Sequence, residues 1–145
     1  MARARIMVIE DNSSEIFLLR RALIAMKGED FELEIASDGE AALQFIQRRD
    51  REEKSHPCVI VLDLHLPKHD GFEILREIRC TPVLADVPVL VTTNGVSPKE
   101  AEELRKMGAG YRLKPRDLAE FATLAADLVT ICNGHKTLQK SLSVS

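Results

Sequence analysis

The 145-residue sequence lacks the patterns that mark membrane-spanning, secreted and nucleotide-binding proteins. It has no apolar run of the roughly 20 residues that a transmembrane helix requires, and its first residues turn acidic before a signal-peptide core can form. The glycine patterns of P-loops and dinucleotide-binding turns are also missing. A net charge of −3 gives no reason to expect nucleic-acid binding. We therefore expect a cytoplasmic protein that binds neither a membrane nor a nucleic acid.

Cysteine is scarce and scattered. Cys58, Cys80 and Cys132 form no CxxC motif and no Cys/His spacing typical of zinc sites. An odd number of widely separated cysteines without a secretion signal favours reduced thiols, as in cytoplasmic proteins. The sequence therefore predicts three free cysteines.

The most informative segment is an apolar run at residues 58–62, CVIVL, which ends abruptly at Asp63. A short apolar run rich in β-branched residues and bounded by turn residues predicts a buried strand. Strands of this kind are typical of parallel sheets that are covered on both faces. Ligands of such sheets bind just outside the carboxyl ends of the strands. Asp63 therefore stands where a ligand site is expected.

Helical and strand patterns alternate five times along the chain. Further strands are predicted at residues 6–9, 31–35, 89–91 and 111–113, the second of them amphipathic and therefore at an edge. This alternation predicts an α/β fold, a doubly wound sheet of five parallel strands with helices on both faces. We expect one domain at residues 1–134, whose last helix ends near Gly134, followed by a flexible tail at residues 135–145.

Three helix starts carry capping-box patterns, in which a cap residue and a glutamate three positions later satisfy each other's backbone groups. The three predicted pairs are Asn12 with Glu15, Ser37 with Glu40, and Ser97 with Glu100.

Several chemically active residues follow predicted strands. Because parallel strands end at one edge of the sheet, we expect Glu10, Asp11, Asp63, a threonine and Lys114 to meet there. Two carboxylates 4 Å apart repel by about 4 kcal/mol at an effective dielectric near 20, so three of them favour a shared cation such as Mg²⁺. An aspartate beside a metal and a lysine is equipped to attack phosphorus and form an acyl phosphate.

These residues resemble a known family, the receiver domain of two-component response regulators. Residues 63–71, DLHLPKHDG, are similar to the family's phosphoacceptor segment, Glu10-Asp11 to its acidic pair and Lys114-Pro115 to its Lys-Pro motif. Tyr111 stands at the position of its switch aromatic. The resemblance covers about residues 4–132 and implies a flavodoxin-like (βα)5 receiver fold.

The resemblance also implies a role for each site residue. Asp63 would accept a phosphoryl group from a phosphohistidine of a sensor histidine kinase. Lys114 would pair first with Asp63 and then with the phosphoryl group, and the Lys114–Pro115 bond would be cis. The implied Mg²⁺ ligands are Asp11, Asp63, the backbone carbonyl of His65 and, mostly through water, Glu10.

The switch hydroxyl is ambiguous. Counting five residues on from Pro88 selects Thr93, whereas counting back from Lys114 selects Thr92. We select Thr93. In either case the threonine pair is followed by Asn94, where the family usually has a small residue.

We expect the signal to leave through a surface of the domain itself, built from the fourth helix, fifth strand and fifth helix. The last helix carries a core stripe of Leu118, Phe121, Ala125 and Leu128. Leu124, Val129 and Ile131 widen this stripe, which fits either a broadly buried helix or a homodimer interface.

The start of the chain and the KPRDL segment resemble stand-alone regulators, including those paired with bacterial phytochromes. The expected partner is therefore a sensor histidine kinase such as a bacterial phytochrome. The expected chemistry is phosphotransfer and slow autodephosphorylation rather than enzymatic turnover.

Two other functions compete with this interpretation. A phosphatase of the haloacid dehalogenase type would need a second aspartate at position 65, which is His65. A phosphorylation-independent receiver-like binding module would be expected to lack Asp63, Lys114 or one acid of the pair, and all are present.

Overall fold

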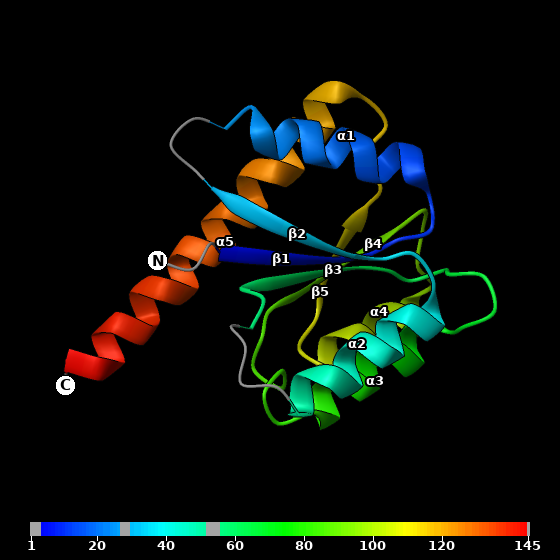
Figure 1. Cartoon of the computed structure of the whole chain (residues 1–145). Coiled ribbons are helices and arrows are strands. Elements are labelled where there is room, and N and C mark those ends of the chain that lie inside the picture. Colours follow the sequence, from blue (N-terminus) through cyan, green and yellow to red (C-terminus); the bar gives the residue numbers. More distant parts are fainter. Residues whose placement is uncertain (1–3, 27–29, 52–55, 145) are drawn as a thin grey trace.

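The structure, a computed structural model, describes residues 4–26, 30–51 and 56–144. Its centre is one sheet in the order β2-β1-β3-β4-β5, with every neighbouring pair parallel (Figure 1). The strands are β1 Ala4–Ile9, β2 Phe31–Ala36, β3 Val59–Asp63, β4 Val89–Thr93 and β5 Gly110–Leu113. The predicted five-stranded parallel sheet is confirmed, and β2 lies at an edge as its alternating sequence indicated.

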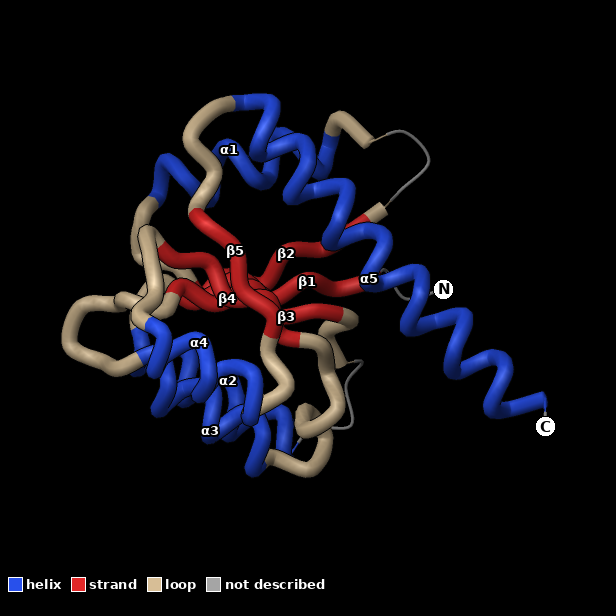
Figure 2. The backbone as a smooth tube through the Cα atoms, turned by 180° about the vertical axis from the view of Figure 1, so that it is seen from behind, coloured by secondary structure: helices blue, strands red, loops and turns tan. Residues whose placement is uncertain are grey.

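Helices cover both faces of the sheet, as predicted for a doubly wound fold. Helices α1 and α5 lie on one face, and α2, α3 and α4 lie on the other (Figure 2). The helices are α1 Ser13–Ile24, α2 Gly39–Arg51, α3 Gly71–Cys80, α4 Pro98–Lys106 and α5 Leu118–Val144.

The central strand β3 contributes to both cores. Ile60 and Leu62 pack under α2, α3 and α4, whereas Val59 and Val61 pack under α1 and α5. All four side chains are buried, and full burial of such a side chain stabilises the fold by about 1.5–3 kcal/mol. Because alternate residues of a strand point to opposite faces, a continuous apolar run is what a strand between two helix layers requires.

The capping boxes predicted for α4 and α2 have different outcomes in the structure. At α4 the capping box is complete, because the Glu100 amide donates to Ser97 Oγ at 3.1 Å and the Ser97 amide donates to Glu100 Oε1 at 2.9 Å. At α2 the prediction is wrong. The cap is Asp38, whose Oδ1 accepts from the Ala41 amide at 2.7 Å, so the helix begins one residue later than a Ser37 cap would place it.

The last helix differs from the prediction at its C-terminal end and in its core stripe. It continues through Gly134 to Val144 instead of ending near Gly134, and its last turns project beyond the sheet (Figure 1). A glycine inside a helix costs only about 1 kcal/mol, which does not by itself end the helix. At the other end Leu118 is 72% exposed and does not belong to the core stripe. The separation of residues 135–145 as a flexible tail stays a prediction.

The widened stripe of α5 is covered within the domain. Leu124 and Val129 are buried beside Phe121, Ala125 and Leu128. The broadly buried helix therefore accounts for most of the stripe without a second subunit.

The expectation of three reduced thiols is wrong for two of the cysteines. Cys58, directly before β3, and Cys132, on α5, form a disulfide, while Cys80 is free and exposed. The two bonded residues are 74 positions apart in the sequence, but α5 packs over the face of the sheet to which Cys58 belongs. Spacing along the chain gave no sign of this proximity because the fold alone creates it.

Among the described residues, no helix has both the length and the apolar character needed to cross a membrane.

Candidate phosphoacceptor and metal site

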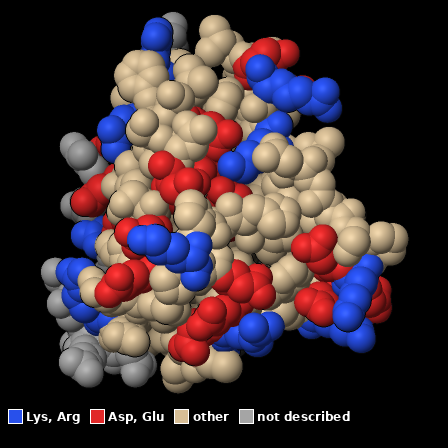
Figure 3. Space-filling view, turned by 90° about the vertical axis from the view of Figure 1, so that its right-hand side faces the viewer, with Lys and Arg blue, Asp and Glu red and all other residues tan. Residues whose placement is uncertain are grey.

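The predicted carboxylates meet at the carboxyl edge of the sheet. Strands β1 and β3 are neighbours, with Ile9 opposite Leu62, so the acids that end them come together. Glu10, Asp11 and Asp63 each place one carboxylate oxygen within 4.8 Å of the others. Figure 3 faces this edge and shows acidic side chains gathered near its centre. Asp63 and Glu10 are buried, whereas Asp11 is exposed.

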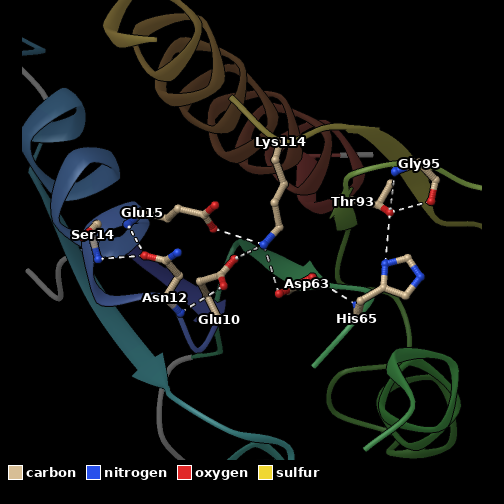
Figure 4. A network of polar contacts seen from close by, with 9 residues as sticks. All are labelled: Glu10, Asn12, Ser14, Glu15, Asp63, His65, Thr93, Gly95 and Lys114. Carbon is tan, nitrogen blue, oxygen red and sulfur yellow. Dashed lines mark hydrogen bonds and ion pairs between the residues drawn. The ribbon is translucent and has the colours of Figure 1, made fainter. Parts of the chain in front are cut away.

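Lys114 enters this cluster from the segment after β5. Its Nζ lies 3.1 Å from Asp63 Oδ2 and 3.3 Å from Glu10 Oε2 (Figure 4). A third acid, Glu15 of α1, contacts the same Nζ at 3.1 Å. Burial alone would lower the pKa of Lys114, but hydrogen bonds to Asp63 and Glu15 and the charge of Glu10 outweigh it and raise that pKa. Lys114 is therefore a firmly held cation among carboxylates.

Glu15 is the site residue that sequence reasoning assigned to a different role. At the start of α1, Asn12 Oδ1 accepts from the amides of Ser14 at 2.9 Å and Glu15 at 3.1 Å, so Asn12 is the cap as predicted. The reciprocal bond of a capping box is absent here, because the Asn12 amide donates to Glu10 Oε1 at 3.1 Å. The Glu15 carboxylate is turned to Lys114 instead.

Glu10 is a buried acid with a strongly raised pKa. Burial, a hydrogen bond with Glu15 and the charge of Asp63 raise the pKa of Glu10 to about 8, against the lowering effects of the Asn12 amide and Lys114. Without a metal, Glu10 therefore holds a proton at neutral pH.

The loop from β3 to α3 holds Asp63 in place. The His65 amide donates to Asp63 Oδ1 at 3.0 Å, while Asp70 caps α3 by accepting from the Phe72 amide at 3.0 Å. A Cβ on Gly71 would lie 2.4 Å from the backbone oxygen of Leu64, which no side chain tolerates. The Asp-Gly pair at the end of residues 63–71 is thus explained by a cap and a close backbone approach.

Replacing this glycine is expected to destabilise the protein. Gly71→Ala forces the loop away from Leu64 and strains the hydrogen bond that the Gly71 amide donates to the Leu64 carbonyl. We expect a loss of about 2–3 kcal/mol in the free energy of unfolding, as for other overpacked sites. Urea denaturation measures it. Gly95→Ala is the matched control, since a Cβ there meets nothing within 4 Å, and equal losses in both variants would contradict the steric explanation.

The two candidate switch threonines occupy different surroundings. Thr93 is fully buried, and its Oγ1 donates to the Gly95 carbonyl at 2.8 Å and accepts from the Gly95 amide at 3.1 Å. The same Oγ1 lies 3.4 Å from His65 Nδ1. Thr92 pairs with Asp63 across the strands and lines a small cavity together with Lys114. Both hydroxyls are near the site, and the choice of Thr93 stays a prediction.

The remaining predicted residues lie on the β5 side of the site. Tyr111 is on the edge strand with 47% of its surface exposed. The Lys114–Pro115 bond is trans, since no peptide bond among the described residues is cis. The expected cis form is therefore wrong for this structure, and trans is the form that X–Pro bonds favour.

The donor set of this site fits a hard divalent cation. Glu10, Asp11 and Asp63 offer carboxylate oxygens, the ligands that Mg²⁺ and similar ions prefer. Lys114, which contacts Asp63 and Glu10, also pairs with Glu15, so its charge is divided among several acids. A divalent ion would relieve the repulsion that remains.

The fold and this site define a receiver domain. The family model of the response regulator receiver domain matches residues 6–126, and the chain belongs to this family. Receiver domains act in two-component signalling, are not an enzyme family, and bind Mg²⁺ or Mn²⁺ at an acidic cluster.

Two curated relatives place the chain among response regulators. It is 42% identical over 89 residues to the response regulator Rcp1 of Synechocystis sp., covering 61% of this chain and 60% of Rcp1. It is 33% identical over 114 residues to the probable methanogenesis regulatory protein FilR2 of Methanothrix harundinacea, covering 76% of this chain and 71% of FilR2. The matched segment thus spans less than two thirds of Rcp1.

Solved structures of response regulators are also similar to this chain. The Mn²⁺-bound form of Rcp1 is similar with a TM-score of 0.73 at 32% identity, covering 84% of this chain and 88% of that one. The phosphorylated cyanobacterial phytochrome response regulator RcpA has a TM-score of 0.73 at 30% identity, covering 86% and 89%. The bacteriophytochrome response regulator RtBRR has a TM-score of 0.68 at 31% identity, covering 88% and 78%.

Proposed function

We propose that this protein accepts a phosphoryl group on Asp63 from a sensor histidine kinase and signals through a changed interaction surface. The observation that carries the proposal is the environment of the Asp63 carboxylate. Its Oδ2 is 3.1 Å from Lys114 Nζ, its Oδ1 accepts from the His65 amide, and Glu10 and Asp11 flank it. A buried carboxylate fixed in this way presents one defined nucleophile to a phosphoryl donor.

The proposed transfer makes one bond and breaks one. An oxygen of Asp63 bonds to phosphorus while the bond from phosphorus to the histidine nitrogen of the donor breaks, and that nitrogen keeps the electron pair. Lys114 donates to the phosphoryl oxygens as charge shifts onto them. Mg²⁺, held by Asp11, Asp63, the His65 carbonyl and, through water, Glu10, would supply further charge neutralisation to these oxygens. Slow loss of the phosphoryl group to water would return the protein to its resting state.

The proposed output is a shift between two states of the α4-β5-α5 face. A phosphoryl oxygen would compete with the Gly95 backbone for the Thr93 hydroxyl, and Tyr111 would then change its rotamer. This face carries exposed apolar side chains, Leu113 at 53% and Leu118 at 72%. A homodimer that includes the fifth helix, or a separate target protein, would bind there.

The proposed phosphodonor is a sensor histidine kinase, such as a bacterial phytochrome. The likeness to RcpA, a cyanobacterial phytochrome response regulator, supports it. A cytoplasmic location is part of the proposal, because the kinase needs ATP to make its phosphohistidine.

The function is tested by incubation with a small phosphodonor. With Mg²⁺ and acetyl phosphate, we expect one acid-labile phosphoryl group per chain by intact-mass measurement, and none when EDTA replaces Mg²⁺. A protein that takes up no phosphate in Mg²⁺ would refute the proposal and favour the phosphorylation-independent binding module. Sedimentation with and without beryllofluoride tests the dimer, and a monomer in both states would remove it.

The raised pKa of Glu10 predicts a pH dependence of stability. Between about pH 4.5 and 8 the folded protein holds a proton on Glu10 that the unfolded chain releases. The metal-free protein should therefore lose stability as pH rises from 6 to 8, by up to about 1.4 kcal/mol per unit. Mg²⁺ competes with this proton, so the increase in melting temperature on adding Mg²⁺ should grow over the same range.

Glu10→Gln isolates this effect. The amide does not titrate, so the difference between wild type and variant removes the contributions of histidines and other groups. We expect the melting temperature of the metal-free variant to depend less on pH between 6 and 8. If the melting temperatures of the two metal-free proteins changed equally with pH between 6 and 8, a raised pKa of Glu10 would be contradicted.

A further inference from the structure

Glu15 reaches the phosphoacceptor site from α1, an element that contributes none of the predicted site residues. Its Oε2 lies 3.1 Å from Lys114 Nζ, although the two residues are 99 positions apart. The helix does not use this side chain as a cap, since the Asn12 amide is already bonded to Glu10 Oε1. The carboxylate is therefore available to Lys114.

The ammonium group of Lys114 is shared among three acidic side chains. A lysine carries three N–H donors. Lys114 donates to Asp63 Oδ2 and to Glu15 Oε2, both at 3.1 Å, and Glu10 Oε2 lies 3.3 Å from its Nζ. In Figure 4 dashed lines join the ammonium to all three acids, and the contacts to Glu15 and Asp63 lie on different sides of it. Glu15 therefore engages one of the three donors of Lys114 before any phosphoryl group is present.

Phosphorylation would force a redistribution of these bonds. When an Asp63 oxygen becomes the bridging oxygen of the acyl phosphate, the carboxylate loses its charge, and the negative charge of the product lies on the new phosphoryl oxygens. Lys114 must then turn a donor from Asp63 Oδ2 toward those oxygens. The Glu15 carboxylate accepts from another donor of the same lysine and opposes that movement. Glu15 is also outside the three-acid cluster that could hold a metal.

We infer that Glu15 is a positioning residue that restrains Lys114 in the unphosphorylated state and limits how fully the lysine engages the incoming phosphoryl group. This inference rests on the proposed phosphorylation of Asp63. Glu15 thereby sets the rate of phosphoryl uptake without touching the reacting atoms. A residue of α1 would then adjust how readily the protein is activated.

The test compares phosphorylation rates of four proteins under the same acetyl phosphate and Mg²⁺ concentrations. Glu15→Gln removes the charge that holds Lys114, and Glu15→Asp keeps it. Glu102→Gln is the matched control, since it changes the net charge equally on the exposed face of α4, where Glu102 pairs with Arg105. The rate constant is read from intact-mass spectra over time.

We expect Glu15→Gln to take up phosphate about two- to fivefold faster than wild type, the range for a partly exposed ion pair. Glu15→Asp and Glu102→Gln should react at the wild-type rate. The inference is overturned if Glu15→Gln is no faster, if Glu15→Asp is as fast as Glu15→Gln, or if Glu102→Gln gains as much. If wild type itself takes up no phosphate, the proposed function fails. If wild type reacts and the variants do not differ, only the role of Glu15 fails.

Discussion

Asp63→Asn is expected to remove phosphoryl uptake from acetyl phosphate, lowering its rate at least about 100-fold, as losing a catalytic nucleophile typically does. The amide has nearly the same shape, and its oxygen still accepts from the His65 amide, so the loop keeps its conformation. It carries no charge, however, and is a poor nucleophile. Lys114 also loses one of its three carboxylates and keeps Glu10 and Glu15.

The variant should remain folded, because its loss of charge reduces repulsion among buried acids. Asp70→Asn is the matched control in the same loop. It makes the same chemical change at the cap of α3, where asparagine serves as well as aspartate, and should take up phosphate as wild type does. Equal phosphate in Asp63→Asn and wild type would place the acceptor on another residue, and mapping the modified peptide would identify it.

The fold was predictable because the hydrophobic pattern of each strand agrees with its position in the sheet. The apolar run before Asp63 has no polar face, so it requires a strand between two helix layers, whereas Phe31, Leu33 and Ile35 alternate with acids and suit an edge. Parallel strands in this order bring the ends of β1 and β3 together. Glu10, Asp11, Asp63 and Lys114 could therefore be placed at one site before any distance was known.

The contact between Glu15 and Lys114 could not be predicted from the sequence, because it depends on which carboxylate accepts from the Asn12 amide. Glu15 has the spacing of a capping glutamate, but Glu10 takes the Asn12 amide and leaves Glu15 to Lys114. Such a choice depends on contacts between α1 and the segment after β5, which periodicity does not encode. A cap and a distant lysine were equally compatible with the local sequence.

The ends of α5 illustrate a second limit. Gly134 is a good terminator, yet local propensity is weak and the helix continues beyond it. Leu118 fits the apolar period, but its side chain is 72% exposed and belongs to neither core cluster. Hydrophobic periodicity identifies the apolar face of a helix, but it does not show how much of that face packs against the sheet.

The Cys58–Cys132 disulfide leads to the second large expected effect. It closes a loop across 74 residues, and in the chain-entropy model a loop of this length restrains the unfolded chain by about 4 kcal/mol. We expect reduction, or Cys58→Ser with Cys132→Ser, to lower the free energy of unfolding by this amount. For a chain of this size, the melting temperature should fall by roughly 10–15 °C.

The two single variants provide the sharpest form of this test, because either one breaks the bond completely. Cys58→Ser and Cys132→Ser should each cost nearly as much as the double variant, so their effects should not add. Cys80→Ser, which removes the free and exposed thiol, is the control and should leave the melting temperature unchanged. Alkylation in denaturant should modify one cysteine before reduction and three after it. Three modified cysteines in unreduced protein would contradict the bond, and Cys58 and Cys132 would then be a buried pair of thiols that joins α5 to the start of β3 by packing alone.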